Sequence, residues 1–238
     1  GGSAATAFRS TTSASSRGYT PLRYAVFMKN IEIVRLLIKS GANVNKISAD
    51  GHTPLKIACS AYESPPVDDM VKLLLDNGAE PGIYNKGTDG PLHYAAMYKQ
   101  PGAVKMLIQY GADVNAKGSY GRTPLIYGAS SARMPDMVKF LIDSGADVNA
   151  TNDSGENALF ELITREESNS EIAKILLDNG IKKDLRNSSK MTALHWRLFA
   201  EKSTLSKYCW STDLTLKTRT PSAIPLLSRQ CRKIKSTR

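Results

Sequence analysis

Apolar residues recur along the chain in a pattern typical of short amphipathic helices. Four segments place apolar residues at i, i+3 and i+4, a spacing that lines one face of an α-helix. They are Ile33-Val34-x-Leu36-Leu37, Met70-Val71-x-Leu73-Leu74, Val104-x-Met106-Leu107 and Met137-Val138-x-Phe140-Leu141. We therefore expect the last residue of each stripe to be deeply buried, namely Leu37, Leu74, Leu107 and Leu141.

Another apolar helix precedes each of these stripes and opens with a Thr-Pro-Leu-like signal. The openings lie 33, 37, 33, 34 and 35 residues apart, a period that predicts a repeat protein. They begin at Thr20, Thr53, Gly90, Thr123, Asn157 and Thr192. In three of them a threonine N-cap precedes a proline at the first helical position, where a missing N–H costs nothing.

A glycine follows each second helix and predicts its end. These glycines are expected to adopt the left-handed conformation, and they are Gly41, Gly78, Gly111, Gly145 and Gly180. Each lies 12 residues before the next opening, so the variation in length falls between the two helices of a unit. No unit can bury its own apolar stripe, and we predict an all-α solenoid in which stacked units share one core.

Two runs carry a resemblance to a known family. Gly51-His52-Thr53-Pro54-Leu55 and Leu92-His93-Tyr94-Ala95-Ala96, together with Gly-Ala-Asp-Val-Asn closures, resemble ankyrin repeats over about residues 18–198. The resemblance implies an ankyrin-repeat solenoid of helix-turn-helix units with hairpin loops over residues 18–210. The expected repeats are 18–46, 51–83, 88–116, 121–150, 155–185 and a partial sixth at 190–210. Residues 1–17 lack periodicity and are expected to be disordered.

Composition narrows the class of protein. The 238 residues are 41% hydrophobic and 23% charged, which is ordinary for a soluble globular protein. No apolar run approaches the roughly 20 residues of a transmembrane segment, and no signal-peptide core is visible at the N-terminus. Three scattered cysteines do not make a disulfide framework. We expect an intracellular, cytoplasmic monomer, with the nucleus left open.

The net charge of +10 is concentrated in the basic tail, residues 211–238. Residues 217–238 hold seven Lys or Arg and no acid, which leaves about +3 for everything before them. A solenoid that binds nucleic acid should carry its charge along one face of the folded body. Nucleic acid is therefore not an expected partner of the repeats. The tail itself remains open to contact with nucleic acid or an anionic membrane.

Residues 225–234 of the tail resemble the start of a SOCS box, which follows ankyrin repeats in ubiquitin-ligase substrate receptors. Leu227, Cys231 and Arg232 match that motif, whereas Ile234 stands one residue earlier than the family's aliphatic position. The cullin-binding half is absent. The resemblance implies a substrate-recognition adaptor with elongin and cullin as partners, and a plain basic tail is the alternative interpretation.

Catalytic chemistry has little support in the sequence. His93 and His195 occupy a Leu-His position where we expect structural hydrogen bonds. No nucleophile with a base and no phosphate-binding glycine loop stands out. The acidic closures do not have the spacing of a calcium loop, and we expect Asp113, Asn115, Asp147 and Asn149 to cap turns. We predict no enzyme activity, no cofactor and no metal.

Binding is the function that the ankyrin resemblance implies. Members of the family use hairpin tips and first helices, which line a concave groove, to bind a partner protein. The corresponding variable positions are His52, Lys86, Met97, Tyr98, Tyr120, Arg122 and Arg165. Tyr98, Tyr120 and Arg122 are the strongest candidates because Tyr and Arg dominate interface hot spots. The sequence pattern does not identify the partner.

Overall fold

The computed structural model describes residues 19–60, 67–85, 87–130, 134–163 and 170–195. The chain divides into two compact units, residues 1–194 and 195–238, and only His195 of the second is described. Across the described ranges the secondary structure consists of ten α-helices and one 3-10 turn, without a strand. The predicted all-α class is therefore confirmed.

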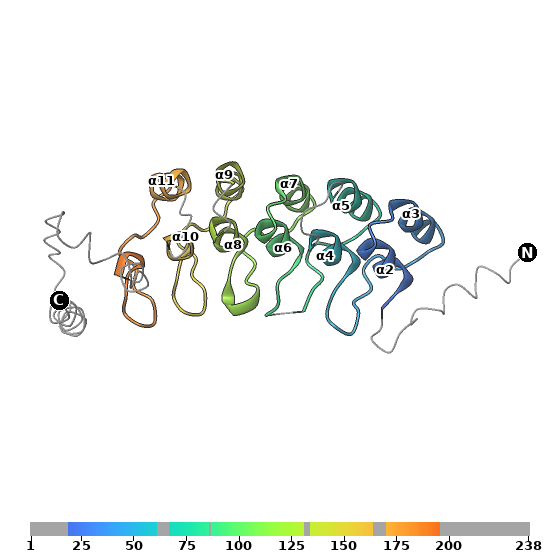
Figure 1. The fold of residues 1–238 in the computed structure, drawn as a ribbon, viewed down its shortest axis with the longest axis horizontal. Helices are drawn as coiled ribbons and strands as arrows, with labels where there is room; N and C mark the ends of the chain where they lie inside the picture. Colours follow the sequence, from blue (N-terminus) through green and yellow to red (C-terminus); the bar gives the residue numbers. More distant parts are fainter. Residues whose placement is uncertain (1–18, 61–66, 86, 131–133, 164–169, 196–238) are drawn as a thin grey trace, which may run out of the picture. The chain divides into compact units, whose positions relative to one another are not determined.

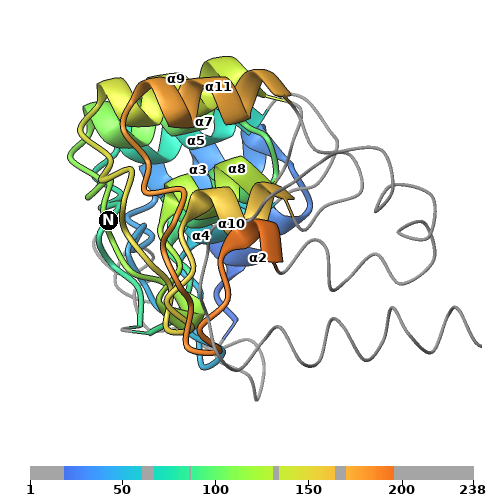
Figure 2. The same ribbon diagram turned by 90° about the vertical axis from the view of Figure 1, so that its left-hand side faces the viewer.

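The helices of the first unit form two rows (Figure 1). The inner row consists of α2 (Pro21–Phe27), α4 (Pro54–Cys59), α6 (Pro91–Met97), α8 (Pro124–Ser130) and α10 (Ala158–Ile163). The outer row consists of α3 (Ile31–Lys39), α5 (Val67–Asp76), α7 (Pro101–Gln109), α9 (Pro135–Asp143) and α11 (Ser170–Asp178). Each inner helix packs on the outer helix of its own repeat, and neighbouring inner helices pack on each other. Seen along the rows, outer helices, inner helices and loops form three layers (Figure 2).

Local chemistry explains where the inner helices begin. The hydroxyl oxygens of Thr20, Thr53 and Thr123 accept hydrogen bonds from the backbone N–H three residues later, at 3.1, 3.2 and 3.4 Å. A proline follows each of these threonines at the first helical position, as expected. Gly90 has no side chain to act as a cap, and its own N–H instead donates to Nδ1 of His93 at 3.0 Å.

The closing glycines end the outer helices in the predicted way. All five have a positive φ, between 78° and 93°. The residue after each glycine donates a backbone hydrogen bond to a carbonyl in the last turn of the helix, as Ala79 N–H does to Leu74 O at 3.0 Å. This arrangement satisfies carbonyl groups that would otherwise lack a partner at the helix end.

The outer helices supply the predicted core leucines with one exception. Leu74, Leu107 and Leu141 are completely buried. Leu37 is only half-buried, so the prediction for that residue was wrong. The reason is its place in the row: α3 packs on α2, and within the described residues no outer helix precedes it to cover its other side.

Asparagine side chains link neighbouring repeats. Asn45, four residues after a closing glycine, donates to Gly78 O at 2.8 Å and accepts from the Glu80 N–H at 2.9 Å. Asn115 and Asn149 make the same pair of bonds to the following closing turn. The prediction that the acidic closures cap turns therefore holds for their aspartates, which bond the N–H two residues later. Their asparagines connect repeats instead.

Candidate functional site

His93 serves as a structural residue at the base of the third and fourth repeats. Its Nδ1 accepts from the Gly90 N–H, and its Nε2 lies 2.9 Å from the carbonyl oxygen of Ala116, to which it donates. The rings of Tyr84 and Tyr127 lie edge-on to it, each at a centroid distance of 6.1 Å. Burial lowers the pKa of His93. With both nitrogens engaged in the neutral form, this histidine is in the structural role expected from sequence.

Tyr120 stands at the tip of the loop before α8 and projects into solvent. It lies in a 3-10 turn, Ser119–Gly121, with a positive φ of 57°. The tip is fixed on both sides: the Ser119 N–H donates to Asp89 at 3.0 Å, and Tyr120 O accepts from the Asp153 N–H at 2.9 Å. The side chain is nevertheless among the most exposed apolar ones, at 76%. The loop tip thus holds a tyrosine ring in solvent on a hydrogen-bonded backbone.

Arg122, two residues further on, is held by groups from neighbouring elements. Its guanidinium forms an ion pair with Glu161 of α10 at 2.8 Å and lies 5.9 and 5.7 Å from the ring centroids of Tyr120 and Tyr127. Burial by itself would lower the pKa of Arg122, but Glu161 raises it. Burial and the nearby Asp89 carboxylate raise the pKa of Tyr127 to about 12. Arg122 is therefore positioned before any partner arrives.

Tyr98 and Met97 lie at the end of α6, where both are half-buried. The Tyr98 ring stacks on that of Tyr94, with centroids 5.8 Å apart and an interplanar angle of 21°. Lys56 of α4 is buried, and its Nζ lies 5.4 Å from the Tyr94 ring centroid. Burial lowers the pKa of Lys56, against the opposing effect of Asp89 and Asp50. The aromatic pair is thus supported from the preceding repeat.

His52 belongs to the turn before α4. Its Nδ1 lies 3.3 Å from a carboxylate oxygen of Asp50, which also forms an ion pair with Arg23 at 2.6 Å. Burial alone would raise the pKa of Asp50, but a hydrogen bond from Ser48 and the charge of Arg23 lower it. His52 is half-buried beside Asp50 and is less exposed to solvent than Tyr120.

Several predicted site residues lie outside the described residues. They are Lys86, Arg165 and the tail positions Leu227, Cys231, Arg232 and Ile234. The structure brings Tyr120 and Arg122 together at one loop tip and places Met97 and Tyr98 at the end of α6, on the inner row.

The structure also exposes residues that the sequence analysis did not select. Tyr24, Phe27 and Met28 of the first repeat are 59%, 64% and 57% exposed. Phe27 and Met28 stand seven and eight residues after their opening, the same positions that Met97 and Tyr98 occupy in the third repeat. Applying that register to the first repeat would have found them.

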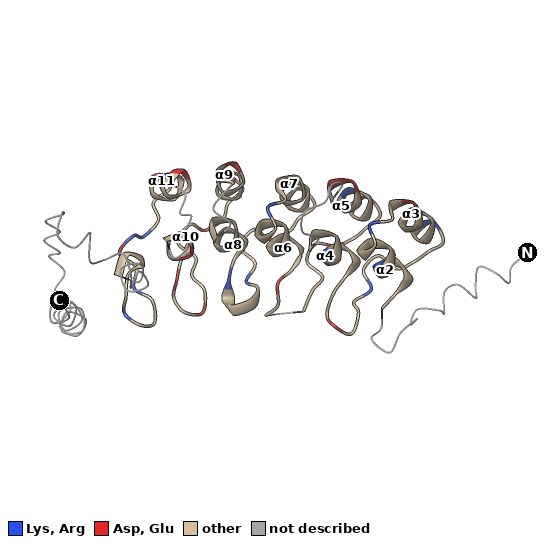
Figure 3. Cartoon of the chain, viewed as in Figure 1, with Lys and Arg blue, Asp and Glu red and all other residues tan. Residues whose placement is uncertain are grey.

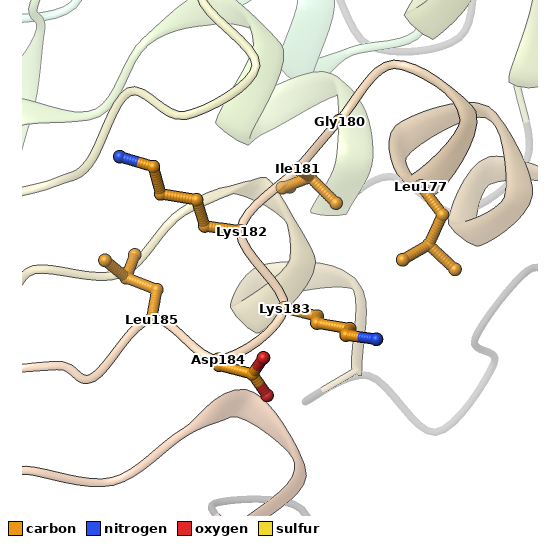
Figure 4. Close-up of a pocket in the computed structure, with 7 residues that line it drawn as sticks. All are labelled: Leu177, Gly180, Ile181, Lys182, Lys183, Asp184 and Leu185. Atoms are coloured by element: carbon orange, nitrogen blue, oxygen red, sulfur yellow. The ribbon is translucent and has the colours of Figure 1, made fainter.

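Other features of the described residues offer less. A cavity of about 570 Å³ beside the loop after α11 is lined by Leu177 and residues 180–185 (Figure 4). Lys182 and Lys183 extend in opposite directions there, so they do not converge on one ligand (Figure 4). Basic and acidic residues are interspersed over the described helices and loops (Figure 3).

The described ranges contain neither a candidate metal site nor a membrane-spanning helix. No group of three or more His, Cys, Asp or Glu side chains is placed there to hold a metal ion. None of the helices seen in the described part is both long enough and apolar enough to cross a membrane.

The geometry defines a class of protein, a solenoid of helix-turn-helix repeats with loops along one side of its inner helices. Comparison with family models identifies the repeats: the model for ankyrin repeats (three copies) matches residues 5–85, 66–152 and 129–203. The chain belongs to the ankyrin-repeat family. Ankyrin repeats are protein–protein interaction modules and typically have no enzymatic activity.

Individual relatives share the repeats over part of their length. The chain is 39% identical over 97 residues to "Ankyrin repeat, SAM and basic leucine zipper domain-containing protein 1" of Dasypus novemcinctus, covering 40% of this chain and 20% of that protein. It is 36% identical over 120 residues to "Transient receptor potential cation channel subfamily A member 1" of Drosophila melanogaster, covering 48% of this chain and 10% of that protein. It is 38% identical over 107 residues to "Alpha-latrocrustotoxin-Lt1a" of Latrodectus tredecimguttatus, covering 44% and 7%. The chain spans a fifth or less of these relatives.

Proposed function

We propose that this chain binds a partner protein through the loop tips and inner helices of its third and fourth repeats, and catalyses no reaction. The observation that carries the proposal is Tyr120. Its left-handed backbone costs about 1–2 kcal/mol for a residue other than glycine, and its ring, in a residue that is 76% exposed, recovers little of that by burial. A conformation that is unfavourable for folding and presents an aromatic ring to solvent is well suited to binding.

Arg122 and Tyr98 add to the binding surface proposed around Tyr120. Arg122 is held by Glu161 and by two aromatic rings, so little side-chain freedom is lost when a partner contacts it. Tyr98 is supported by its stacking on Tyr94. We name Met97, Tyr98, Tyr120 and Arg122 the groove surface. Tyr and Arg are enriched among residues that dominate binding energy, and here both types are positioned in advance.

Two residues that could act as a base or a nucleophile, His93 and Cys59, are committed to structure. His93 uses both ring nitrogens in hydrogen bonds. Burial raises the pKa of the Cys59 thiol, which opposes formation of the reactive thiolate. These two observations support a binding role in preference to a catalytic one.

A displayed library of random peptides, selected against the full chain, provides ligands to test the proposal. We expect Tyr98→Ala and Tyr120→Ala each to weaken binding of the selected peptides by about tenfold or more. A tenfold change in the dissociation constant corresponds to about 1.4 kcal/mol. Fluorescence polarisation measures the dissociation constants. Tyr110→Ala is the matched control, because Tyr110 is 45% exposed but lies after the outer helix α7. A loss at Tyr110 equal to that at the groove residues would contradict the proposal.

A further inference from the structure

The first and third repeats carry the same short pattern at the end of the inner helix. Tyr24-Ala25-Val26-Phe27-Met28-Lys29 and Tyr94-Ala95-Ala96-Met97-Tyr98-Lys99 lie 70 residues apart. In each, a tyrosine and two small or medium residues precede two large apolar residues and a lysine. The second and fourth repeats have Ser60 and Ser130 where Phe27 and Met97 stand. Among the first four repeats the pattern therefore marks the first and the third, and the fifth repeat has Thr164 and Arg165 at the two apolar positions.

Both apolar pairs lie off the buried face of their helix. Leu22, Ala25 and Val26 form the buried stripe of α2, and Leu92, Ala95 and Ala96 form that of α6. The next two residues are turned by about 100° and 200° from the end of that stripe. Accordingly Phe27 and Met28 are exposed, and Met97 and Tyr98 are half-exposed. The shared register places the two pairs at equivalent points of their repeats.

The distance between the two pairs follows from the row of inner helices. α4 lies between α2 and α6 and packs on both (Figure 1). Packed helix axes are about 8–10 Å apart, so the two pairs are separated by roughly 16–20 Å. An extended segment covers that distance in about five or six residues at about 3.3 Å per residue.

Each apolar pair has a cation beside it. Lys29 and Lys99 follow directly, with φ values of 56° and 59°, and neither forms an ion pair with a carboxylate among the described residues. The inner helices of the first three repeats also carry Arg23 and Lys56, and no Asp or Glu. Since Arg23 is paired with Asp50 and Lys56 is buried, Lys29 and Lys99 are the cations of these inner helices and of the turns directly after α2 and α6 that a partner can reach.

We propose that Phe27, Met28 and Lys29 form one anchor site, and Met97, Tyr98 and Lys99 a second, for a single acidic and apolar segment of the partner protein. That segment carries a large apolar side chain next to an Asp or Glu at two points five or six residues apart. The inference rests on the proposed function and extends its groove surface to the first repeat. Because one segment occupies both anchors, the second contact forms at a high effective concentration.

The probe is the displayed library of random peptides, selected separately against the full wild-type chain and its Lys29→Glu/Lys99→Glu variant. Peptides selected on the wild type should be enriched in Asp or Glu beside large apolar residues at two points with the stated spacing. Those selected on the variant should carry Lys or Arg at these points instead, because charge complementarity determines which partners are rejected. Unchanged charge preference between the two pools would overturn the proposal.

Affinity measurements then test each anchor. We expect each of two double variants to bind the peptides selected on the wild type about tenfold or more weakly. They are Phe27→Ser/Met28→Ser and Met97→Ser/Tyr98→Ser. The matched control is Ile33→Ser/Leu36→Ser on the outer helix α3, where two apolar side chains are 46% and 64% exposed. That variant should retain wild-type affinity, and equal melting curves establish that all the variants fold.

The outcomes separate the two proposals. If peptides depend on Tyr98 and Tyr120 but not on Phe27 and Met28, the two-anchor inference is wrong and the proposed function stands. If they depend on no inner-row residue, both are wrong. If the α3 control weakens binding as much as the anchors do, general adhesion to exposed apolar residues explains the binding, and the inference is again wrong. Where a serine variant fails to fold, the affinity of the wild-type peptides for the exposed-site variant Lys29→Glu is measured instead. Weaker binding supports the inference, and unchanged binding overturns it.

Discussion

At the scale of single residues, His93 shows how a titratable group can be fixed in one protonation state by its neighbours. Nδ1 accepts from Gly90, so it carries no proton, and Nε2 donates to the Ala116 carbonyl. Protonation of Nδ1 would remove an acceptor from a buried N–H, and burial disfavours the charged ring as well. The structural role and the lowered pKa of His93 therefore have the same physical origin.

Because of His93, the stability of the protein should decrease as the pH is lowered. Below about pH 6.5 the unfolded chain binds a proton at this histidine, while the folded chain resists it until the pH reaches its lowered pKa. We expect the free energy of unfolding, measured in urea, to decrease between pH 7.5 and pH 5.5. His93→Gln should reduce that slope, and the turn variant His52→Gln serves as the comparison. An unchanged slope in His93→Gln would show that this histidine does not cause it.

The depth at which a leucine is buried also determines how much it contributes to the free energy of unfolding. Leu74 is completely buried, so Leu74→Ala should lower the free energy of unfolding by about 2–5 kcal/mol. Leu37 has the same place in its helix but is half-buried at the start of the outer row, so Leu37→Ala should cost clearly less. Urea titration of the two variants measures the difference. Equal losses would mean that Leu37 is covered in solution.

At the scale of elements, the sequence predicted what local chemistry controls. Threonine before proline and glycine at a left-handed position each specify a helix end without help from distant residues, and those ends were confirmed. The exposure of Leu37 depends on the lack of an outer helix before α3 among the described residues, which a repeating pattern does not reveal. For the candidate site, the register located Tyr120 and Arg122. Glu161, which pairs with Arg122, and Asp89, which accepts from the Ser119 N–H beside Tyr120, come from adjacent repeats, and no sequence period identifies which side chains will meet.

The asparagine links between repeats make a further element-scale prediction at Gly82. This residue stands four positions after Gly78, where Asn45, Asn115 and Asn149 stand after their own closing glycines. A Cβ at Gly82 would meet nothing within 4 Å, so a side chain fits. Gly82→Asn should bond the next closing turn at Gly111 O and the Asp113 N–H. We expect about 1 kcal/mol of added stability relative to Gly82→Ala, the value of one or two exposed hydrogen bonds.

The comparison with Gly82→Ala removes the effect of glycine on the unfolded chain, which itself amounts to about 0.4–1 kcal/mol. Asn115→Ala is the reciprocal test and should lower stability, because it deletes two bonds to the next turn. Urea titration gives all three values. No difference between the Gly82 variants would mean that this turn does not reach its neighbour.

At the scale of the whole molecule, the distribution of charge separates the repeats from the C-terminal tail. Seven basic residues and no acid follow residue 216, beside a nearly balanced repeat region. We expect deletion of residues 214–238 to leave the affinity for groove-selected peptides within about twofold of wild type, because no groove residue is removed. Fluorescence polarisation with the peptides used above checks this. Loss of binding or of folding would show that the tail completes the repeat unit.

Hydrogen exchange of the full chain, with and without a saturating selected peptide, tests the central claim most directly, because it reports on every amide without a choice of mutation. Binding at the groove surface should slow exchange in the loop tip at residues 119–122, at the end of α6 and, if both anchors are used, at the end of α2. The outer helices α5, α7 and α9 should change little. Protection concentrated in those outer helices, with no change around Tyr98 and Tyr120, would contradict the account.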